Sequence, residues 1–552
     1  MSQTTFLMRS KLLLFLCLVL STSLLGQVDL LDSGGPLMPE QAAYDVNFYE
    51  LQLQIFPEKQ TIAGDLMVRA TIVHPTAVFV LDLDPVLAVE ATKMSDGSSL
   101  SFERRGSKLW IHLLGTQQRG TQIEVVVSYG GKPRVAPNPP WDGGFSWEKT
   151  PSGADWIATS CQTQGADIWW PNKDHVSDEP DSMALHIRVP DPLMVAANGR
   201  FQRKETHSDA TSSYHWYIST PINTYNVALN IAPYVLLKEG FKSISGEIVP
   251  VEFYVLPEDE SKGEKLMPEI LEHLAFYEKY LGPYPFRKDK YGVAQTPHLG
   301  MEHQTIIAYG ANFNNGSMTG GKDWGFDALH HHELGHEWWG NLVTNYDWKD
   351  MWIHEGFCSY MQAVYMEELE GKKGYHAYMD NMRRFPNKLA VSPEESTSAK
   401  NIYRAPIYSK GAWILHSLRY LIGEEAFLSS LRKMCYPHPA LESVTDGRQC
   451  RFVTTADYQR ICEQESGQDL SWFFALYLRQ AALPTLISRV EGNHITLRWE
   501  TPDNLPFQMP VDLKLGNTRK RVNVTHKAQK FPFPKGVKPE VDPDKWILME
   551  VK

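Results

Sequence analysis

Residues 332–336 read His-Glu-Leu-Gly-His, and after eighteen further residues Glu355 follows in the run Trp-Ile-His-Glu-Gly-Phe (352–357). Positions i and i+4 share one face of a helix, so His332 and His336 can reach a single metal ion. Imidazole nitrogens suit Zn²⁺. Glu333 lies between the two histidines, where a carboxylate can act as a general base without binding the metal. The stretch predicts a zinc site on a helix.

A catalytic zinc site takes three protein ligands and keeps one position open. We predict Glu355 as the third ligand, because residues 348–353 are mostly apolar and residues 356–369 continue as a helix. Two antiparallel helices would then hold all three ligands. His330 and His331 lack a partner in helical register with an intervening Glu, so we expect them at the helix start or around the ligands. A chance match of the five-residue pattern remains the alternative, since that pattern alone is weak.

The run 332–344, His-Glu-Leu-Gly-His-Glu-Trp-Trp-Gly-Asn-Leu-Val-Thr, together with the run around Glu355, resembles the zinc aminopeptidases of the aminopeptidase N and leukotriene hydrolase family, which are gluzincin metallopeptidases. The family pattern has the same spacing. The resemblance implies a thermolysin-like, mainly helical catalytic domain, one Zn²⁺ per chain, and hydrolysis of N-terminal residues from peptides that have a free N-terminus.

Residues 299–303 read Leu-Gly-Met-Glu-His where the family has Gly-Ala-Met-Glu-Asn. The resemblance implies that Glu302 binds the α-amino group of the substrate and that the backbone at Gly300 and Met301 lines the peptide. A carboxylate facing an ammonium group is a charge-assisted pair and selects chain ends. Gln162, in Ser-Cys-Gln (160–162), matches a family glutamine that helps to hold the same amino group; an ordinary loop residue is the alternative.

Residues 403–411 read Tyr-Arg-Ala-Pro-Ile-Tyr-Ser-Lys-Gly. They resemble the family's Tyr-x-Lys-Gly motif, which implies that the Tyr408 hydroxyl faces the reacting carbonyl. A donor aimed at the developing oxyanion contributes about 3 kcal/mol. The role of Tyr403 stays open. Glu337 and Asn341 are candidates to orient the ligands, although Glu337 also fits a solvated side chain.

The length of 552 residues predicts two to four domains. We expect a multidomain α+β protein: an N-terminal antiparallel β domain (27–242), a thermolysin-like zinc catalytic domain (243–483) and a small β domain (484–552). Alternating apolar residues predict the strands, and apolar residues at helical spacing predict a helix over 266–281. The family's further C-terminal helical domain is expected to be absent, which suggests a more open cleft.

The N-terminus has the pattern of a secretory signal, expected over residues 1–26. Basic residues precede an apolar run, 12–25, that is short for a membrane span. We therefore expect export to the periplasm or the exterior, with no transmembrane domain in the mature chain; an uncleaved anchor is the alternative. Five cysteines follow the signal, and an oxidising compartment would allow a disulfide among the last three.

The formal net charge is −11 and no basic run is present, which argues against nucleic acid as a partner. Peptides are the expected partners, and the oligomeric state is open. A zinc endopeptidase is one alternative function, but Glu302 would gain little from an uncharged internal peptide. A catalytically inactive peptide-binding protein is another, although no ligand or general base is missing. An epoxide hydrolase, known in one branch of the family, is specified by nothing in the sequence.

Overall fold

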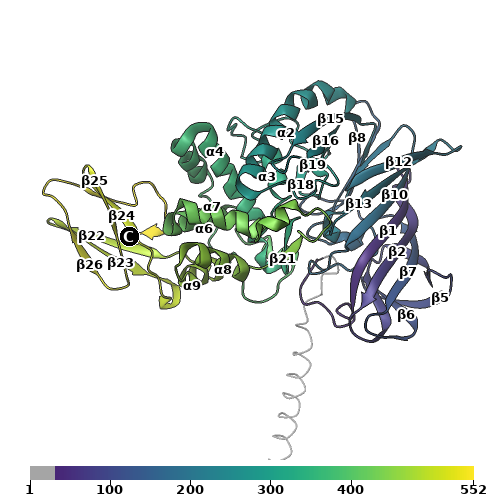
Figure 1. Ribbon diagram of the computed structural model, residues 1–552, viewed down its shortest axis with the longest axis horizontal. Coiled ribbons are helices and arrows are strands. Elements are labelled where there is room, and N and C mark those ends of the chain that lie inside the picture. Colours follow the sequence, from purple (N-terminus) through teal and green to yellow (C-terminus); the bar gives the residue numbers. More distant parts are fainter. Residues whose placement is uncertain (1–31) are drawn as a thin grey trace, which may run out of the picture.

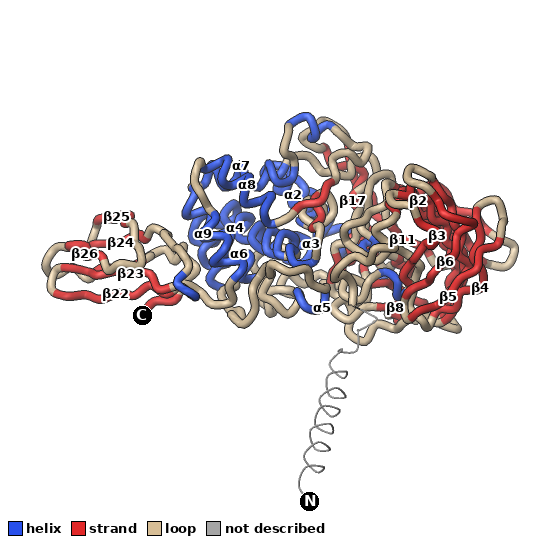
Figure 2. The backbone as a smooth tube through the Cα atoms, turned by 90° about the horizontal axis from the view of Figure 1, so that it is seen from below, coloured by secondary structure: helices blue, strands red, loops and turns tan. Residues whose placement is uncertain are grey.

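A computed structural model describes residues 32–552 and shows an elongated molecule built of three units in a row (Figures 1 and 2). A large β unit lies at one end, a mainly helical unit at the centre and a small β unit at the other end. The predicted multidomain α+β architecture is confirmed. The predicted signal, 1–26, lies outside the described residues. Within residues 32–552, no helix is long and apolar enough to cross a membrane.

The first unit is built on a ten-stranded sheet whose neighbours run antiparallel except for the parallel pair β1 and β10. Strand β1 shows why this segment folds as it does: Tyr49, Leu51, Leu53 and Ile55 are buried, and the residues between them are more exposed. In spatial order the strands are β12 (Arg200–Thr206), β13 (Thr211–Ile218), β10 (Ser182–Pro190), β1 (Tyr44–Phe56), β2 (Thr61–Ile72), β7 (Gln122–Gly131), β4 (Leu87–Met94), β5 (Ser99–Arg105), β6 (Lys108–Gln117) and β3 (Thr76–Asp82).

A second, four-stranded sheet carries the loops of the first unit that reach the centre of the molecule. Its order is β11 (Met194–Ala197), β14 (Leu229–Ala232), β9 (Asp155–Ser160) and β8 (Gly144–Lys149). The loop that leaves β9 contains Gln162. The side chain of Gln164 accepts from Gly143 N at 2.7 Å and donates to Asp142 Oδ1 at 3.0 Å, so this loop is tied to the one before β8.

The central unit contains a five-stranded sheet that hydrophobic patterning did not predict beyond its first strands. Its order is β15 (Val235–Lys242), β16 (Ile248–Val255), β17 (Tyr291–Gln295), β19 (Ile307–Tyr309) and β18 (Gly300–Met301). The last three strands are short and almost wholly buried, so they show no alternation. β15 and β16 form an antiparallel hairpin. The expected boundary between residues 242 and 243 falls inside this hairpin, and we propose that the central unit begins near residue 235.

The helices of the central unit follow the predicted periodicity. In α2 the apolar residues Leu266, Ile270, Leu274, Tyr277 and Leu281 are all buried, and the helix ends at Gly282. The helices are α2 (Glu260–Leu281), α3 (Ala328–Gly335), α4 (Trp352–Asn381), α5 (Ala399–Ile402), α6 (Ser409–Ile422), α7 (Glu424–Cys435), α8 (Thr455–Ser466) and α9 (Ser471–Arg479); strands β20 (Val343–Asn345) and β21 (Arg451–Val453) pair between them.

Helices α4 and α6 approach each other most closely at two glycines. A Cβ atom added to Gly411 would lie 2.9 Å from Gly356 Cα, and one added to Gly356 would lie 3.0 Å from Gly411 Cα. Real Cβ atoms tolerate such contacts poorly, so both positions need glycine. Because Gly356 follows Glu355 directly and Gly411 lies three residues after Tyr408, this contact sets how near those two side chains can come.

The third unit packs two small sheets beyond α9. One has the order β26 (Gln529–Pro532), β23 (His494–Glu500), β22 (Thr485–Glu491) and β28 (Glu550–Val551); the other has β25 (Thr518–Val522), β24 (Val511–Leu515) and β27 (Pro539–Val541). The chain returns from this unit to α6, where the Trp546 ring stacks on His416 with centroids 4.5 Å apart. The five cysteines of the described residues are free, so the disulfide that an oxidising compartment would allow is not formed.

The glycine contact generates the first prediction. Gly356→Ala and Gly411→Ala are each expected to lower the free energy of unfolding by about 1–3 kcal/mol, because each inserts a methyl group into a filled contact. Since both methyl groups compete for one space, the double variant should deviate from additivity. Chemical unfolding followed by tryptophan fluorescence measures these values. Ser409→Ala, in the first turn of α6, is the control and should change stability by less than about 0.5 kcal/mol; full additivity of the glycine variants would contradict the shared contact.

Candidate active site

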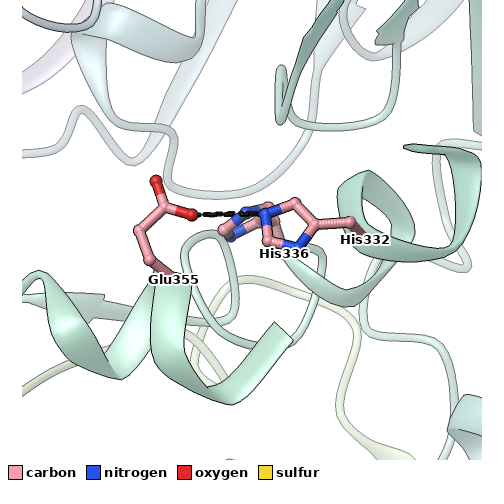
Figure 3. Close-up of side chains that lie close together, drawn as sticks. All are labelled: His332, His336 and Glu355. Carbon is pink, nitrogen blue, oxygen red and sulfur yellow. Dashed lines mark hydrogen bonds and ion pairs between the residues drawn. The ribbon is translucent and has the colours of Figure 1, made fainter. Parts of the chain in front are cut away.

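Helices α3 and α4 bring the three predicted metal ligands together (Figure 3). His332 Nε2 lies 3.2 Å from His336 Nε2 and 3.2 Å from Glu355 Oε2, and His336 Nε2 lies 3.5 Å from the same oxygen. Asp327 caps the start of α3 by accepting from His330 N at 3.0 Å. The three side chains are almost completely buried. Two nitrogens and one carboxylate oxygen thus form a compact triangle inside the protein.

The dimensions of this triangle fit zinc. Ligand atoms bound tetrahedrally at about 2.0–2.1 Å lie about 3.3 Å from one another, and the three distances here are 3.2, 3.2 and 3.5 Å. His336 donates its Nδ1–H to Trp339 O at 3.0 Å, which leaves Nε2 as the lone-pair nitrogen that faces the other ligands. The donor set of two imidazoles and one carboxylate is one that zinc takes in catalytic sites.

The second oxygen of Glu355 accepts two tyrosine hydroxyls. Tyr408 OH lies 2.7 Å and Tyr403 OH 2.9 Å from Glu355 Oε1. Although burial acts to raise it, the neighbouring His332 and His336 rings hold the pKa of Glu355 below its usual value, so the carboxylate is ionised. The position of Tyr403, which the sequence left open, is therefore beside Tyr408 at the metal-ligand carboxylate.

Glu333 points into the same space from α3. Burial raises the pKa of its carboxyl well above the usual value; the charge of His336 opposes this shift and that of Glu302 adds to it. Gly300, in the edge strand β18, lies directly against it. A Cβ atom at Gly300 would come within 2.5 Å of Glu333 Oε1 and 2.6 Å of Leu329 Cδ1. The glycine that replaces the family's alanine here therefore leaves room for the Glu333 carboxylate.

A cavity of about 600 Å³ lies between the first and central units and contains all of these groups. Every residue to which the sequence assigned catalysis, metal binding or substrate binding lines it: Gln162, Gly300, Met301, Glu302, His332, Glu333, His336, Glu355 and Tyr408. Further lining residues that the sequence did not single out include Trp141, Met318 and Leu329. The structure therefore brings together four stretches of sequence that are separated by up to about 250 residues.

Glu302 occupies the end of the cavity nearest the first unit. Its Oε1 accepts hydrogen bonds from Gln162 Nε2 and, at 3.1 Å, from Tyr225 OH. The backbone carbonyl of Glu302 accepts from Asn341 Nδ2 at 3.1 Å. Tyr225 was missed because its surroundings, Asn-Thr-Tyr-Asn (223–226), carry no motif. Asn341 holds the backbone of Glu302 rather than orienting a metal ligand.

Three further residues on or beside α3, Glu337, His330 and His331, lie in the core. Glu337 is fully buried, which excludes a solvated role, and its Oε1 accepts from Thr305 N at 2.7 Å. His330 contacts Tyr291 OH at 2.9 Å and His273 Nδ1 at 2.8 Å, whereas His331 packs against Tyr277. Both histidines therefore lie away from the metal position. This was expected, because neither has a partner histidine in helical register with a glutamate between them.

Comparisons with known proteins agree with this geometry. Residues 267–475 match the peptidase family M1 domain. Over 357 residues the chain is 24% identical to endoplasmic reticulum aminopeptidase 1 of Homo sapiens. This alignment covers 58% of this chain and 38% of that protein. Over 439 residues it is 25% identical to probable aminopeptidase 1 of Saccharolobus solfataricus, and this alignment covers 75% of this chain and 51% of that protein. The chain thus matches between about a third and a half of the length of these relatives.

Solved structures show the same fold. An M1 zinc metallopeptidase mutant from Deinococcus radiodurans, bound to a Tyr-Ser-Ala substrate, matches with a TM-score of 0.65 at 23% identity, over 82% of this chain and 98% of that one. Legionella pneumophila aminopeptidase A, in complex with aspartic acid, matches with a TM-score of 0.71 at 18% identity, over 92% of this chain and 60% of that one.

His303, which stands where the family motif has Asn, generates a prediction about acid stability. Its ring is fully buried and neither nitrogen has a hydrogen-bond partner. Burial, with a smaller effect of His298, lowers its pKa to about 3, against 6.5 for an ordinary histidine. Between these pH values the unfolded chain binds a proton that the folded chain does not, so the fold loses stability as the pH falls.

We expect His303 alone to cost about 2 kcal/mol of unfolding free energy between pH 7 and pH 5. His303→Asn should remove this part of the pH dependence, which urea unfolding at the two pH values measures. His526→Asn, at an exposed position, is the control for removing a histidine without changing the core. An unchanged pH dependence in His303→Asn would show that this histidine is not held neutral by the fold.

Proposed function

We propose, from the premise that the chain belongs to the peptidase M1 family, that it is a zinc-dependent aminopeptidase that removes N-terminal residues from peptides. One observation carries the proposal: the carboxylate of Glu302 and the ligand triangle of His332, His336 and Glu355 line the same cavity. A metal position that activates an amide and a carboxylate that receives an ammonium group are the two parts that removal of a terminal residue requires.

His332, His336 and Glu355 would hold the zinc through the atoms that face one another. When bound, the zinc would polarise the scissile carbonyl and lower the pKa of water towards about 7. The hydrogen bonds from Tyr403 and Tyr408 keep the Glu355 side chain in place, and the Trp339 carbonyl does the same for the His336 ring.

Glu333 is the proposed general base. Its carboxyl oxygen takes the proton of the attacking water and then delivers it to the leaving amine. Burial raises the pKa of this group, which makes it a better base than an exposed glutamate and lets it hold the proton between the two transfers. The absent side chain at Gly300 keeps the space next to the carboxylate open.

Tyr408 is the proposed oxyanion donor. Its hydroxyl lies 2.7 Å from the ligand carboxylate of Glu355, which puts a hydrogen-bond donor beside the metal position. Burial raises the pKa of the phenol well above its usual value, so the hydroxyl keeps its proton. It can therefore donate a hydrogen bond to the negative charge that develops on the carbonyl oxygen.

Glu302 and Gln162 are the proposed amine-binding pair, and Tyr225 supports them. Two donors converge on Glu302 Oε1, which orients the carboxylate toward the cavity. An α-ammonium group would form a charge-assisted pair with it. Strand β18 is the last strand of its sheet, so the backbone at Gly300 and Met301 is placed to accompany an extended peptide.

A zinc endopeptidase is the second candidate function, because it would use the same metal ligands and base. The amine-binding carboxylate argues against it, since an internal peptide has no ammonium group to compensate that buried charge. An inactive binding protein is the third candidate. It is disfavoured because the ligands, Glu333 and Tyr408 are all present and converge on one cavity.

The walls of the cavity favour an apolar N-terminal residue. Trp141, Leu299, Met318 and Leu329 line it, and among the described residues none of the lining side chains is Lys or Arg. Met318 is presented by the loop between β19 and α3 and contacts Gln362 Nε2 through its sulfur at 3.7 Å. An acidic substrate side chain would meet Glu302 and Glu333 without a Lys or Arg side chain to pair with it. The predicted signal further supports export to the periplasm or the exterior.

The decisive experiment compares wild type with Glu333→Ala on aminoacyl chromogenic substrates, with metal analysis of both proteins. Wild type should cleave substrates with a free amine, ignore their acetylated forms and contain about one zinc per chain. Glu333→Ala should retain the zinc and lose activity by a factor of at least about 1,000. Equal cleavage of acetylated substrates would favour the endopeptidase, and zinc without turnover in wild type would favour the binding protein.

Side-chain preference is tested by Met318→Ala. Wild type should have a higher kcat/KM for leucyl and phenylalanyl substrates than for alanyl ones, and the lowest for aspartyl ones. Met318→Ala should lower kcat/KM for the leucyl substrate by about 10-fold, because an apolar contact is lost, and leave the alanyl value nearly unchanged. Met318→Leu is the matched control and should keep the preference. A uniform loss on all substrates would assign Met318 a structural role only.

A further inference from the structure

A polar groove of about 480 Å³ lies on the ten-stranded sheet and shares no lining residue with the catalytic cavity. Strands β1, β2, β10, β12 and β13 contribute to it, on the side of the first unit where these strands lie next to one another (Figure 1). Its floor carries two histidines, His186 and His215, which nothing in the proposed peptidase mechanism uses.

The backbone fixes these two histidines against each other. His186 on β10 and His215 on β13 are direct partners in the antiparallel register. Directly opposed residues have Cβ atoms about 5 Å apart and project to the same face of the sheet. The Nδ1 atoms of the two rings lie 2.7 Å apart, and the ring centroids are separated by 4.7 Å.

Each ring has a carboxylate at its other nitrogen. Glu50 Oε1 lies 3.3 Å from His186 Nε2, and Glu205 Oε2 lies 3.7 Å from His215 Nε2. A neutral imidazole has a single N–H. If both rings direct it to their carboxylates, two Nδ1 lone pairs face each other at 2.7 Å. If one ring directs it to the other ring, a bare Nε2 faces a carboxylate. One N–H shared between the rings at 2.7 Å leaves His215 Nε2 without a hydrogen-bond partner, as observed. A metal ion bound to both Nδ1 lone pairs would instead let each ring carry its N–H on Nε2.

We propose that His186 and His215 form a second metal site, which takes one divalent transition-metal ion through their Nδ1 atoms and completes its coordination with water from the groove. Histidines that bind metals characteristically donate their other N–H to a carboxylate, as Glu50 permits here for His186. Cis nitrogens of a square-planar ion with bonds of about 2.0 Å lie about 2.8 Å apart, close to the 2.7 Å observed.

The two rings are in the neutral form, which is the form that binds metal ions. Burial, together with the charge of Arg203, lowers the pKa of both rings, so the neutral form that binds metals is the stable one at neutral pH. Arg188 also lines the groove, but Asp209 Oδ2 accepts from it at 2.6 Å. Asp65 on β2 adds a negative charge to the same groove. Among divalent ions, Cu²⁺ binds imidazole nitrogens most tightly, so it is the probe of choice.

The test is a titration of the zinc-loaded full chain with Cu²⁺, followed by calorimetry and electron paramagnetic resonance. Wild type should bind one Cu²⁺ beyond the catalytic zinc, with a spectrum split by two nitrogen ligands and with its zinc retained. His186→Ala and His215→Ala should each weaken this binding by at least about 10-fold. Glu50→Ala preserves both rings and should weaken it about 10-fold, because the His186 ring loses the acceptor that orients it.

His112→Ala is the matched control. His112 also lies on this sheet beside a carboxylate, Glu103, at 3.1 Å, but it has no second histidine as a cross-strand partner. Its replacement should leave Cu²⁺ binding unchanged. The proposal is overturned if wild type binds no additional ion, or if the variant that lacks both His186 and His215, shown to be folded by circular dichroism, binds Cu²⁺ as wild type does.

Discussion

The site depends on one constraint: three ligand atoms that carry lone pairs or charge must lie within about 3.5 Å of one another inside the protein. Such groups are costly to bury without a compensating cation. The fold meets the constraint over a short stretch of chain. His332 on α3 and His336, the C-cap of that helix, lie one turn apart, and Glu355 lies in the first turn of α4. The burial that makes the triangle unfavourable when empty makes it a strong binding position for zinc.

The other groups that we propose for the reaction are placed relative to this triangle by close contacts at glycines, where there is no room for a side chain. The contact between Gly356 and Gly411 lets α6 approach α4 until Tyr408 reaches Glu355. Gly300 lets strand β18 lie against Glu333. Glu302 is then held from the first unit by Gln162 and Tyr225, so the cavity is complete only where the two units meet.

The sequence was sufficient to predict that His332, His336 and Glu355 lie together, because a single helix repeat and one spacing determine their relative positions. It was also sufficient for strands and helices that alternate between core and solvent, such as β1 and α2. It did not reveal β17, β18 and β19, whose residues are buried on both faces and show no period. Trp141 and Met318 reach the cavity, and Tyr225 reaches Glu302, only through local chain conformation and the contact between units, which no local pattern encodes. The same holds for the paired rings of His186 and His215, which are neighbours through strand register alone.

The most direct test is a crystal structure with anomalous diffraction measured on both sides of the zinc absorption edge. A second group of side chains, Glu302, Glu333 and His336, also lies close enough to hold an ion, so the position of the metal distinguishes two accounts. We expect one zinc peak bonded at about 2 Å to His332 Nε2, His336 Nε2 and Glu355, with Glu333 and Glu302 outside its coordination. A zinc peak held by Glu302 and Glu333 instead would contradict the roles of base and amine-binding carboxylate assigned to them.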